Sequence, residues 1–340
     1  MLTNLLRPWI VARLLSGTAA VILCTVGVVV AIRVLRYWRV GATSEGQLAL
    51  ERRAELVAAV VQVALAVSIA NVASTVLSAD RLTHSIRGAM CAWGVFDASP
   101  WGFAALGTSI AAAAGCAFWV VLHRLDLRHA RPTLTRRKFY ALFLILPLLA
   151  ADLVATTEWV LDLDMQVVAS CCSIGLDDAL ATTGGAESGP RALSAWLALG
   201  AAGLAALLAF ATWRRPGRLV ALVAGFVSAI ASVLALPAIL GYVAPHAYES
   251  PHHLCPFCLL HADVGGIGWP LFGALFAAGV FGVAIGLVET QRRAGEAEHV
   301  DGFERRLGGW ASALWTVTIL IAAAPVVRWA VISGGASLFP

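Results

Sequence analysis

The chain has 340 residues, of which 60% are hydrophobic and 13% are charged, and its formal net charge is +4. Soluble domains average roughly 25% charged residues, so this composition excludes an ordinary water-soluble protein. The positive charge calls for no nucleic-acid partner, because the cations stand in short segments between long apolar runs. The composition therefore predicts a polytopic membrane protein surrounded by the lipid bilayer.

Eight apolar runs are long enough to cross a bilayer, whose hydrocarbon core of roughly 30 Å needs about 20 residues per helix. Only helices and closed barrels satisfy the backbone in lipid, and runs of this length predict helices. We expect an all-α bundle in a single transmembrane domain, 1–340. The first run is interpreted as an uncleaved helix, because Arg33, Arg36 and Arg39 follow it where a signal peptide would carry a small-residue cleavage site. The predicted helices are 12–35, 54–78, 101–123, 139–161, 191–213, 219–243, 264–289 and 309–332.

The distribution of cations between the loops predicts the orientation of these helices. Of the 24 lysine and arginine residues, 18 lie in alternate loops, around 33–53, 124–138, 214–218 and 292–306. Loops rich in cations stay on the cytoplasmic side. The loops 79–100, 162–190 and 244–263 are therefore expected to face the periplasm, with both termini on that side of a bacterial inner membrane.

Cysteines concentrate in the three predicted outer loops. Cys24 and Cys116 fall within helices and are interpreted as small packing residues. The outer side of a membrane is the oxidising side, where disulfides persist, so the distribution favours thiol chemistry there. The other five of the seven cysteines are Cys91, Cys171, Cys172, Cys255 and Cys258.

An internal repeat relates the outer loops. The segments CAWGVFDA from Cys91, CSIGLDDA from Cys172 and CPFCLLHA from Cys255 share one pattern. Their first cysteines are about 82 residues apart, which predicts three tandem two-helix repeats with one further helix at each end. Each copy would place a cysteine at the start of a descending helix, where the helix dipole stabilises a thiolate. The last polar position of the pattern holds Asp97, Asp178 or His261.

The third copy carries the most specific motif, HHLCPFCLLH, over 252–261. Pro256 suits the first position of a helix. We therefore expect Cys255 near the cap of the helix 264–289 and Cys258 one turn inside it. Thiols in this arrangement suit a dithiol–disulfide couple, a soft-metal site or a structural disulfide, and the motif alone leaves all three open.

The segment 139–290 resembles the vitamin K epoxide reductase family and, more distantly, quinone-linked disulfide-generating membrane proteins. That family carries a loop cysteine pair after the first helix of a four-helix bundle and a CxxC at the fourth, in a context such as CPWCLLSA. Here the loop pair is Cys171 and Cys172, and CPFCLLHA precedes the seventh helix. The resemblance implies a four-helix redox core that passes electrons from a substrate dithiol through the loop cysteines to Cys255 and Cys258, and then to a quinone. Cys171 and Cys172 depart from the family pattern, because they are adjacent instead of spaced.

Histidines near the dithiol support a different use of the same thiols. Thiolate and imidazole ligands suit copper(I), zinc or mercury. A soft-metal binding or transport protein is therefore the alternative function, and a membrane subunit pinned by structural disulfides is the second alternative. The expected ligands are Cys91, Cys172, Cys255, Cys258, His252, His253 and His261.

Asp152 stands inside the predicted helix 139–161, where a carboxylate is costly and indicates function by default. We expect it either to handle protons or a quinone, or to pair with another helix through Arg328. The preferred function is thus a thiol–disulfide oxidoreductase working with a quinone, a periplasmic thiol protein or other membrane subunits. Its expected site residues are Cys255, Cys258, Cys172, Cys171, Cys91, Asp152 and His261.

Overall fold

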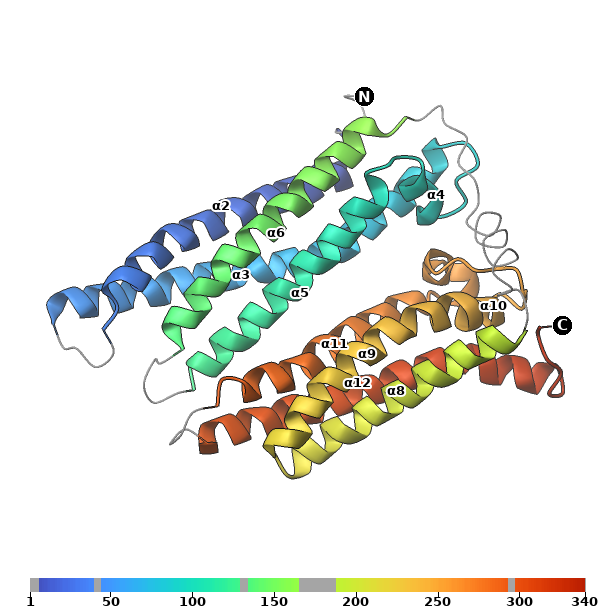
Figure 1. The fold of residues 1–340 in the computed structure, drawn as a ribbon. Coiled ribbons are helices and arrows are strands. Elements are labelled where there is room, and N and C mark those ends of the chain that lie inside the picture. Colours follow the sequence, from blue (N-terminus) through green and yellow to red (C-terminus); the bar gives the residue numbers. More distant parts are fainter. Residues whose placement is uncertain (1–5, 40–43, 129–133, 165–187, 293–296, 340) are drawn as a thin grey trace. The chain divides into compact units, whose positions relative to one another are not determined.

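The computed structural model describes residues 6–39, 44–128, 134–164, 188–292 and 297–339 (Figure 1). Within these residues the chain is helical and contains no strand. Among them, eight helices are long and apolar enough to cross a membrane, in agreement with the predicted number of apolar helices. They are α2 (Pro8–Tyr37), α3 (Glu45–Leu82), α5 (Gly102–Asp126), α6 (Thr135–Asp162), α8 (Ser188–Arg214), α9 (Arg218–Ala238), α11 (Gly268–Glu289) and α12 (Ala297–Ile332).

Most of these helices extend beyond the apolar runs that predict them. The α3 helix, for example, begins at Glu45 because Ser44 caps it by accepting a hydrogen bond from the backbone amide of Gln47. Such ends are polar, so hydropathy does not detect them, whereas capping does. Shorter elements join the long helices at one end of each bundle. They are η1 (Thr83–Ser85), α4 (Ala92–Asp97), the π-helical η2 (Ile239–Val243), α10 (Ala244–Ala247), η3 (Phe257–Leu260) and η4 (Ala262–Val264).

The chain divides into two compact units, 1–169 and 170–340. In the first unit, α2 packs against α3 and α6, and α5 packs against the same two helices, which closes a ring of four antiparallel helices (Figure 1). Small residues allow the helices to approach: a Cβ atom on Gly27 of α2 would lie 2.7 Å from a methyl group of Val61 on α3. The core of this ring includes Cys24 and Cys116, both fully buried, in agreement with their predicted packing role.

The second unit is a ring with the same order of neighbours. The α8 helix packs against α9 and α12, and α11 packs against the same two. A Cβ atom on Gly225 of α9 would lie 2.9 Å from the Cα atom of Gly286 on α11, so two glycines bring these backbones together. Likewise, a Cβ atom on Gly308 of α12 would lie 2.7 Å from the Ala209 carbonyl oxygen of α8.

The two units can be compared with the predicted three-part repeat and the predicted redox core. In each unit, a cysteine-bearing segment connects the second and third long helices, at Cys91 in the first and at Cys255 in the second. The copy at Cys172 lies outside the described residues, so the three-part repeat stays a prediction. The range 139–290 includes α6 of the first unit and three helices of the second, and its grouping as a redox core also stays a prediction.

Candidate functional site

The candidate site of the second unit lies between α9 and α11. Here the chain leaves α9 through the π-helix η2 and the short α10, then crosses an irregular stretch to η3 and η4. A π-helix is rare and is found frequently at functional sites. Gly265 and Gly266 have φ values of 70° and 62°, a left-handed conformation that glycine adopts without strain. This conformation ends the short helices before α11 begins at Gly268.

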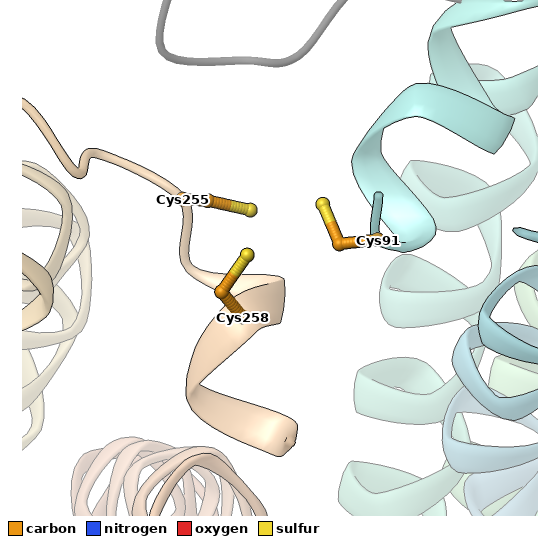
Figure 2. A group of neighbouring side chains, drawn as sticks. All are labelled: Cys91, Cys255 and Cys258. Carbon is orange, nitrogen blue, oxygen red and sulfur yellow. The ribbon is translucent and has the colours of Figure 1, made fainter. Parts of the chain in front are cut away.

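Cys255 and Cys258 bring their thiols together on this segment. Cys255 lies on the irregular stretch and Cys258 in η3, with the Sγ atoms within 4.8 Å of one another. Figure 2 shows the two sulfurs turned toward each other. Both residues are buried, with relative exposures of 1% and 7%.

The predicted position of this dithiol at the start of a transmembrane helix is wrong. The helix after it begins ten residues beyond Cys258, because the two left-handed glycines prevent a continuous helix. Pro256 does precede a helix, as expected, but that helix is the four-residue η3. The dipole of so short a helix is small, so the structure does not provide the thiolate stabilisation expected from α11.

Several contacts hold the dithiol segment in place. The Tyr248 hydroxyl donates a 2.8 Å hydrogen bond to the carbonyl oxygen of Cys258, and the His261 amide donates to the same atom at 3.0 Å. Leu254 and Leu259, one beside each cysteine, are fully buried. From α8, the Arg191 guanidinium donates a 2.6 Å hydrogen bond to the Pro251 carbonyl oxygen. The thiols are therefore presented by a fixed turn, and the sequence analysis missed Tyr248 and Arg191.

The histidines near the dithiol make different contacts. The His253 ring stacks on Tyr248, with centroids 3.8 Å apart, and His252 is exposed. His246 donates from Nδ1 to the Tyr242 carbonyl oxygen at 2.7 Å. Among the described residues, no histidine nitrogen joins the group of ligand atoms that contains the two sulfurs. The structure thus brings together the thiols of Cys255 and Cys258, and the group of close ligand atoms that holds them includes none of the nitrogens of His252, His253 and His261.

The remaining predicted cysteines fall in other parts of the chain. In the first unit, Cys91 directly precedes α4 as its N-cap residue and is buried (Figure 2). Its side chain makes no capping hydrogen bond, and α4 has only six residues. Cys171 and Cys172 lie outside the described residues.

Asp152 pairs with an arginine that the sequence analysis did not choose. Its Oδ1 atom lies 2.6 Å from Nη2 of Arg13 on α2, and both residues are buried at 3% and 1% exposure. The expected partner, Arg328, instead forms a 3.0 Å ion pair with Glu249, so that part of the prediction is wrong. Arg13 can be recognised in the sequence as a cation inside an apolar run, and such a residue needs a buried counter-ion.

Polar side chains from all four long helices of the first unit complete the surroundings of this ion pair. Arg13 donates hydrogen bonds to Thr75 of α3 at 2.7 Å, Ser109 of α5 at 3.0 Å and Thr156 of α6 at 3.2 Å. Because Arg13 neutralises the buried Asp152, we interpret this ion pair as a structural link between the four helices and not as a path for protons. The Ser16 hydroxyl of α2 donates a 2.8 Å hydrogen bond to Asn71 Oδ1 of α3, which adds one more polar contact between these helices.

In comparisons with known proteins, no family model, no curated protein and no solved structure matches the chain.

Proposed function

We propose that the chain is a multi-pass membrane protein in which Cys255 and Cys258 form a thiol–disulfide exchange site. The observation that carries the proposal is the approach of the two sulfurs to within 4.8 Å on a turn fixed by Tyr248 and Arg191. A disulfide bond is about 2.05 Å long, so a side-chain rotation and a small shift of the turn would join the sulfurs.

The proposed reaction has two balanced steps. In the first, the Cys255–Cys258 disulfide accepts two electrons and two protons from a substrate dithiol, which leaves as a disulfide. In the second, Cys255 and Cys258 lose two electrons and two protons to an acceptor, and their S–S bond forms again. A quinone takes up two electrons and two protons in becoming a quinol, so it balances the second step. A periplasmic thiol protein is the proposed substrate.

An apolar cavity of the second unit supports a quinone as the acceptor. The cavity, of about 220 Å³, is lined by α8, α9, η2, α11 and α12, and includes Tyr242, Val243 and Leu271. Val243 and Leu271 also belong to the packed cluster that contains Leu259, the residue after Cys258. Ligand sites of this kind are concave and mostly apolar, with few polar groups.

A trapping experiment tests the exchange reaction. In Cys258→Ser, the remaining Cys255 thiol cannot be resolved by its partner, so a mixed disulfide with the substrate protein should accumulate. In the matched control Cys116→Ser, which alters a buried core thiol of the first unit, no such adduct is expected. Reducing and non-reducing electrophoresis with mass spectrometry identifies the adduct. Absence of a Cys255 adduct in Cys258→Ser, together with absence of a Cys258 adduct in Cys255→Ser, would contradict the proposal.

Soft-metal binding is the second candidate, because the sulfur separation also suits one bridging ion. Two Zn–S bonds of about 2.3 Å span at most about 4.6 Å, close to the observed limit of 4.8 Å. This function predicts copper or zinc in the purified protein at a fixed ratio. The metal should be lost in Cys255→Ser and Cys258→Ser and retained in Cys24→Ser. A preparation without metal that takes up neither copper(I) nor zinc would exclude it.

The dithiol is proposed to face the periplasm, with both termini on the same side, on the basis of the cation bias of the opposite loops. Single cysteines introduced into a cysteine-free chain test this orientation. A membrane-impermeant maleimide should label Ala262→Cys, an exposed residue near η4, in intact cells. It should label Arg215→Cys, exposed after α8, only once the membrane is opened. The reverse pattern would invert the topology.

A further inference from the structure

Three groups of buried carboxylates occur among the described residues, and two of them are simple ion pairs. Asp152 faces Arg13 at 2.6 Å in the middle of the first unit. Asp126 at the end of α5 faces Lys138 of α6, also at 2.6 Å. In each pair one carboxylate meets one cation, so the charges balance without any further ligand.

The third group lies at the end of the second unit opposite to the dithiol, and its charges do not balance. Arg292, just after α11, contacts three carboxylates: Glu289 at 2.6 Å, Asp301 at 2.7 Å and Glu304 at 3.1 Å. The side chains of Glu289 and Glu304 are buried, with 1% and 0% exposure, whereas that of Asp301 is 38% exposed. One guanidinium thus meets two buried carboxylates and one carboxylate in contact with water.

Other charged residues at this end of the unit point to water. Arg215 after α8, Arg218 at the start of α9, and Arg305 and Arg306 of α12 are exposed. Arg214 is exposed too and lies over the rings of Phe210 and Trp213. Burial acts to lower the pKa of Arg292, but its hydrogen bonds to Glu289 and Asp301, and the charges of Glu304 and Glu289, raise the pKa above its ordinary value. Arg292 is therefore always charged and counts as one cation.

Glu289 and Glu304 contact the same guanidinium group, through Nε and Nη2 of Arg292, so their carboxyl groups lie close to each other. Two ionised carboxylates placed side by side repel each other, and neither has a proton to donate. Furthermore, Oε1 of Glu289 and Oε1 of Glu304 are buried and receive no hydrogen bond from any residue that the structure describes. Two buried carboxyl groups therefore share one guanidinium, and each keeps one oxygen without a hydrogen-bond donor.

We infer that Glu289 and Glu304 together bind one proton. They would form a proton-binding site at the end of the second unit opposite to the dithiol, which the proposed orientation places on the cytoplasmic side. The shared proton supplies the missing donor and removes one of two like charges that a buried site holds at high cost. Arg292 then balances the carboxylate that remains, while Asp301 stays ionised in contact with water. Loss of the proton places two negative charges between α11 and α12 and loosens this contact.

Infrared spectroscopy of the purified protein in lipid nanodiscs tests the inference. At neutral pH, a buried carboxylic acid shows a C=O stretching band that shifts in heavy water. We expect this band in the unchanged protein. It should be lost in Glu304→Gln and in Glu289→Gln, because the amide of glutamine donates the hydrogen bond and the remaining carboxylate pairs with Arg292. Asp301→Asn, the control at the partly exposed member, should retain the band.

Each other outcome overturns the inference. Absence of the band from the unchanged protein means that no buried acid exists, and its persistence in both glutamine variants places the acid elsewhere. Loss in only one variant means that the proton belongs to that residue alone and is not shared. A divalent cation at a fixed ratio, removed by Glu304→Gln and accompanied by no band, would identify a metal ion in place of the proton. Glutamine has nearly the same shape as glutamate, so we expect both variants to keep the fold. Circular dichroism should show that they remain helical.

Discussion

The backbone of Cys258 is held by two hydrogen bonds. Its carbonyl oxygen accepts hydrogen bonds from the Tyr248 hydroxyl and the His261 amide, and Leu259 next to it is fully buried. Cys255 lies outside η3, on the irregular stretch before it. Tyr248 therefore helps to set the position of Cys258 relative to Cys255.

Tyr248→Phe should make the Cys255–Cys258 disulfide easier to reduce. The variant removes one hydrogen bond, worth about 1 kcal/mol, that organises the turn for a close approach of the sulfurs. For a two-electron couple this corresponds to a reduction potential higher by roughly 20 mV. Equilibration with glutathione buffers, followed by alkylation and mass spectrometry, measures the potential. Tyr140→Phe, at an exposed position of α6, is the control. An unchanged potential in Tyr248→Phe would show that the hydroxyl does not organise the dithiol.

Arg13 and Asp152 should behave as a coupled pair in unfolding. Asp152→Leu or Arg13→Leu leaves one buried charge without its partner, and we expect a loss of about 3 kcal/mol or more in the free energy of unfolding. The double replacement Arg13→Leu with Asp152→Leu should cost less than the sum of the single changes. Denaturant titration in mixed micelles provides the four values of this cycle. Additive losses would mean that the two side chains do not stabilise each other.

At the scale of the helices, close contacts between small residues determine how the second unit packs. Gly225 and Gly286 let α9 and α11 approach until a Cβ atom on the first would be 2.9 Å from the backbone of the second. Gly203 of α8 has no atom within 4 Å of such a Cβ position. Both residues stand in apolar helical runs, so composition alone does not distinguish the glycine that packs from the one that does not.

Gly225→Val should destabilise the second unit, because the added side chain must push α9 and α11 apart. Overpacking of this kind typically costs about 1–3 kcal/mol. Gly203→Val is the matched control and should change the free energy of unfolding by no more than about 0.5 kcal/mol. Thermal unfolding in detergent compares the two variants directly. Equal losses would indicate that the cost arises from the helix backbone and not from the contact with Gly286.

The eight long apolar helices of the described residues could be predicted from the sequence because each depends on a continuous local run of residues. Each needs only a run of about 20 apolar residues, and every predicted range overlies one long helix. The dithiol was likewise recognisable from its spacing. Its position relative to α11 was not, because the backbone conformation of Gly265 and Gly266, which ends η4, depends on the surrounding packing.

The partner of Asp152 depends on tertiary structure in the same way. Arg13 and Asp152 are 139 positions apart, and only the closed ring of α2, α3, α5 and α6 brings them together. Arg328 was the expected partner because it and Asp152 lie toward the same predicted side of their helices, 309–332 and 139–161. In the structure Arg328 belongs to the second unit, where its contact with Glu249 joins α12 to the segment after α10.

For the whole molecule, the central claim is that a buried dithiol in a helical membrane protein changes its redox state as it works. Differential alkylation with mass spectrometry, on membranes prepared under oxidising and reducing growth and combined with elemental analysis, tests it most directly. The account predicts a Cys255–Cys258 disulfide that appears under oxidising growth, disappears under reducing growth, and is abolished by Cys258→Ser without loss of protein. Two permanently reduced thiols, or a fixed disulfide whose removal eliminates the protein, would contradict it.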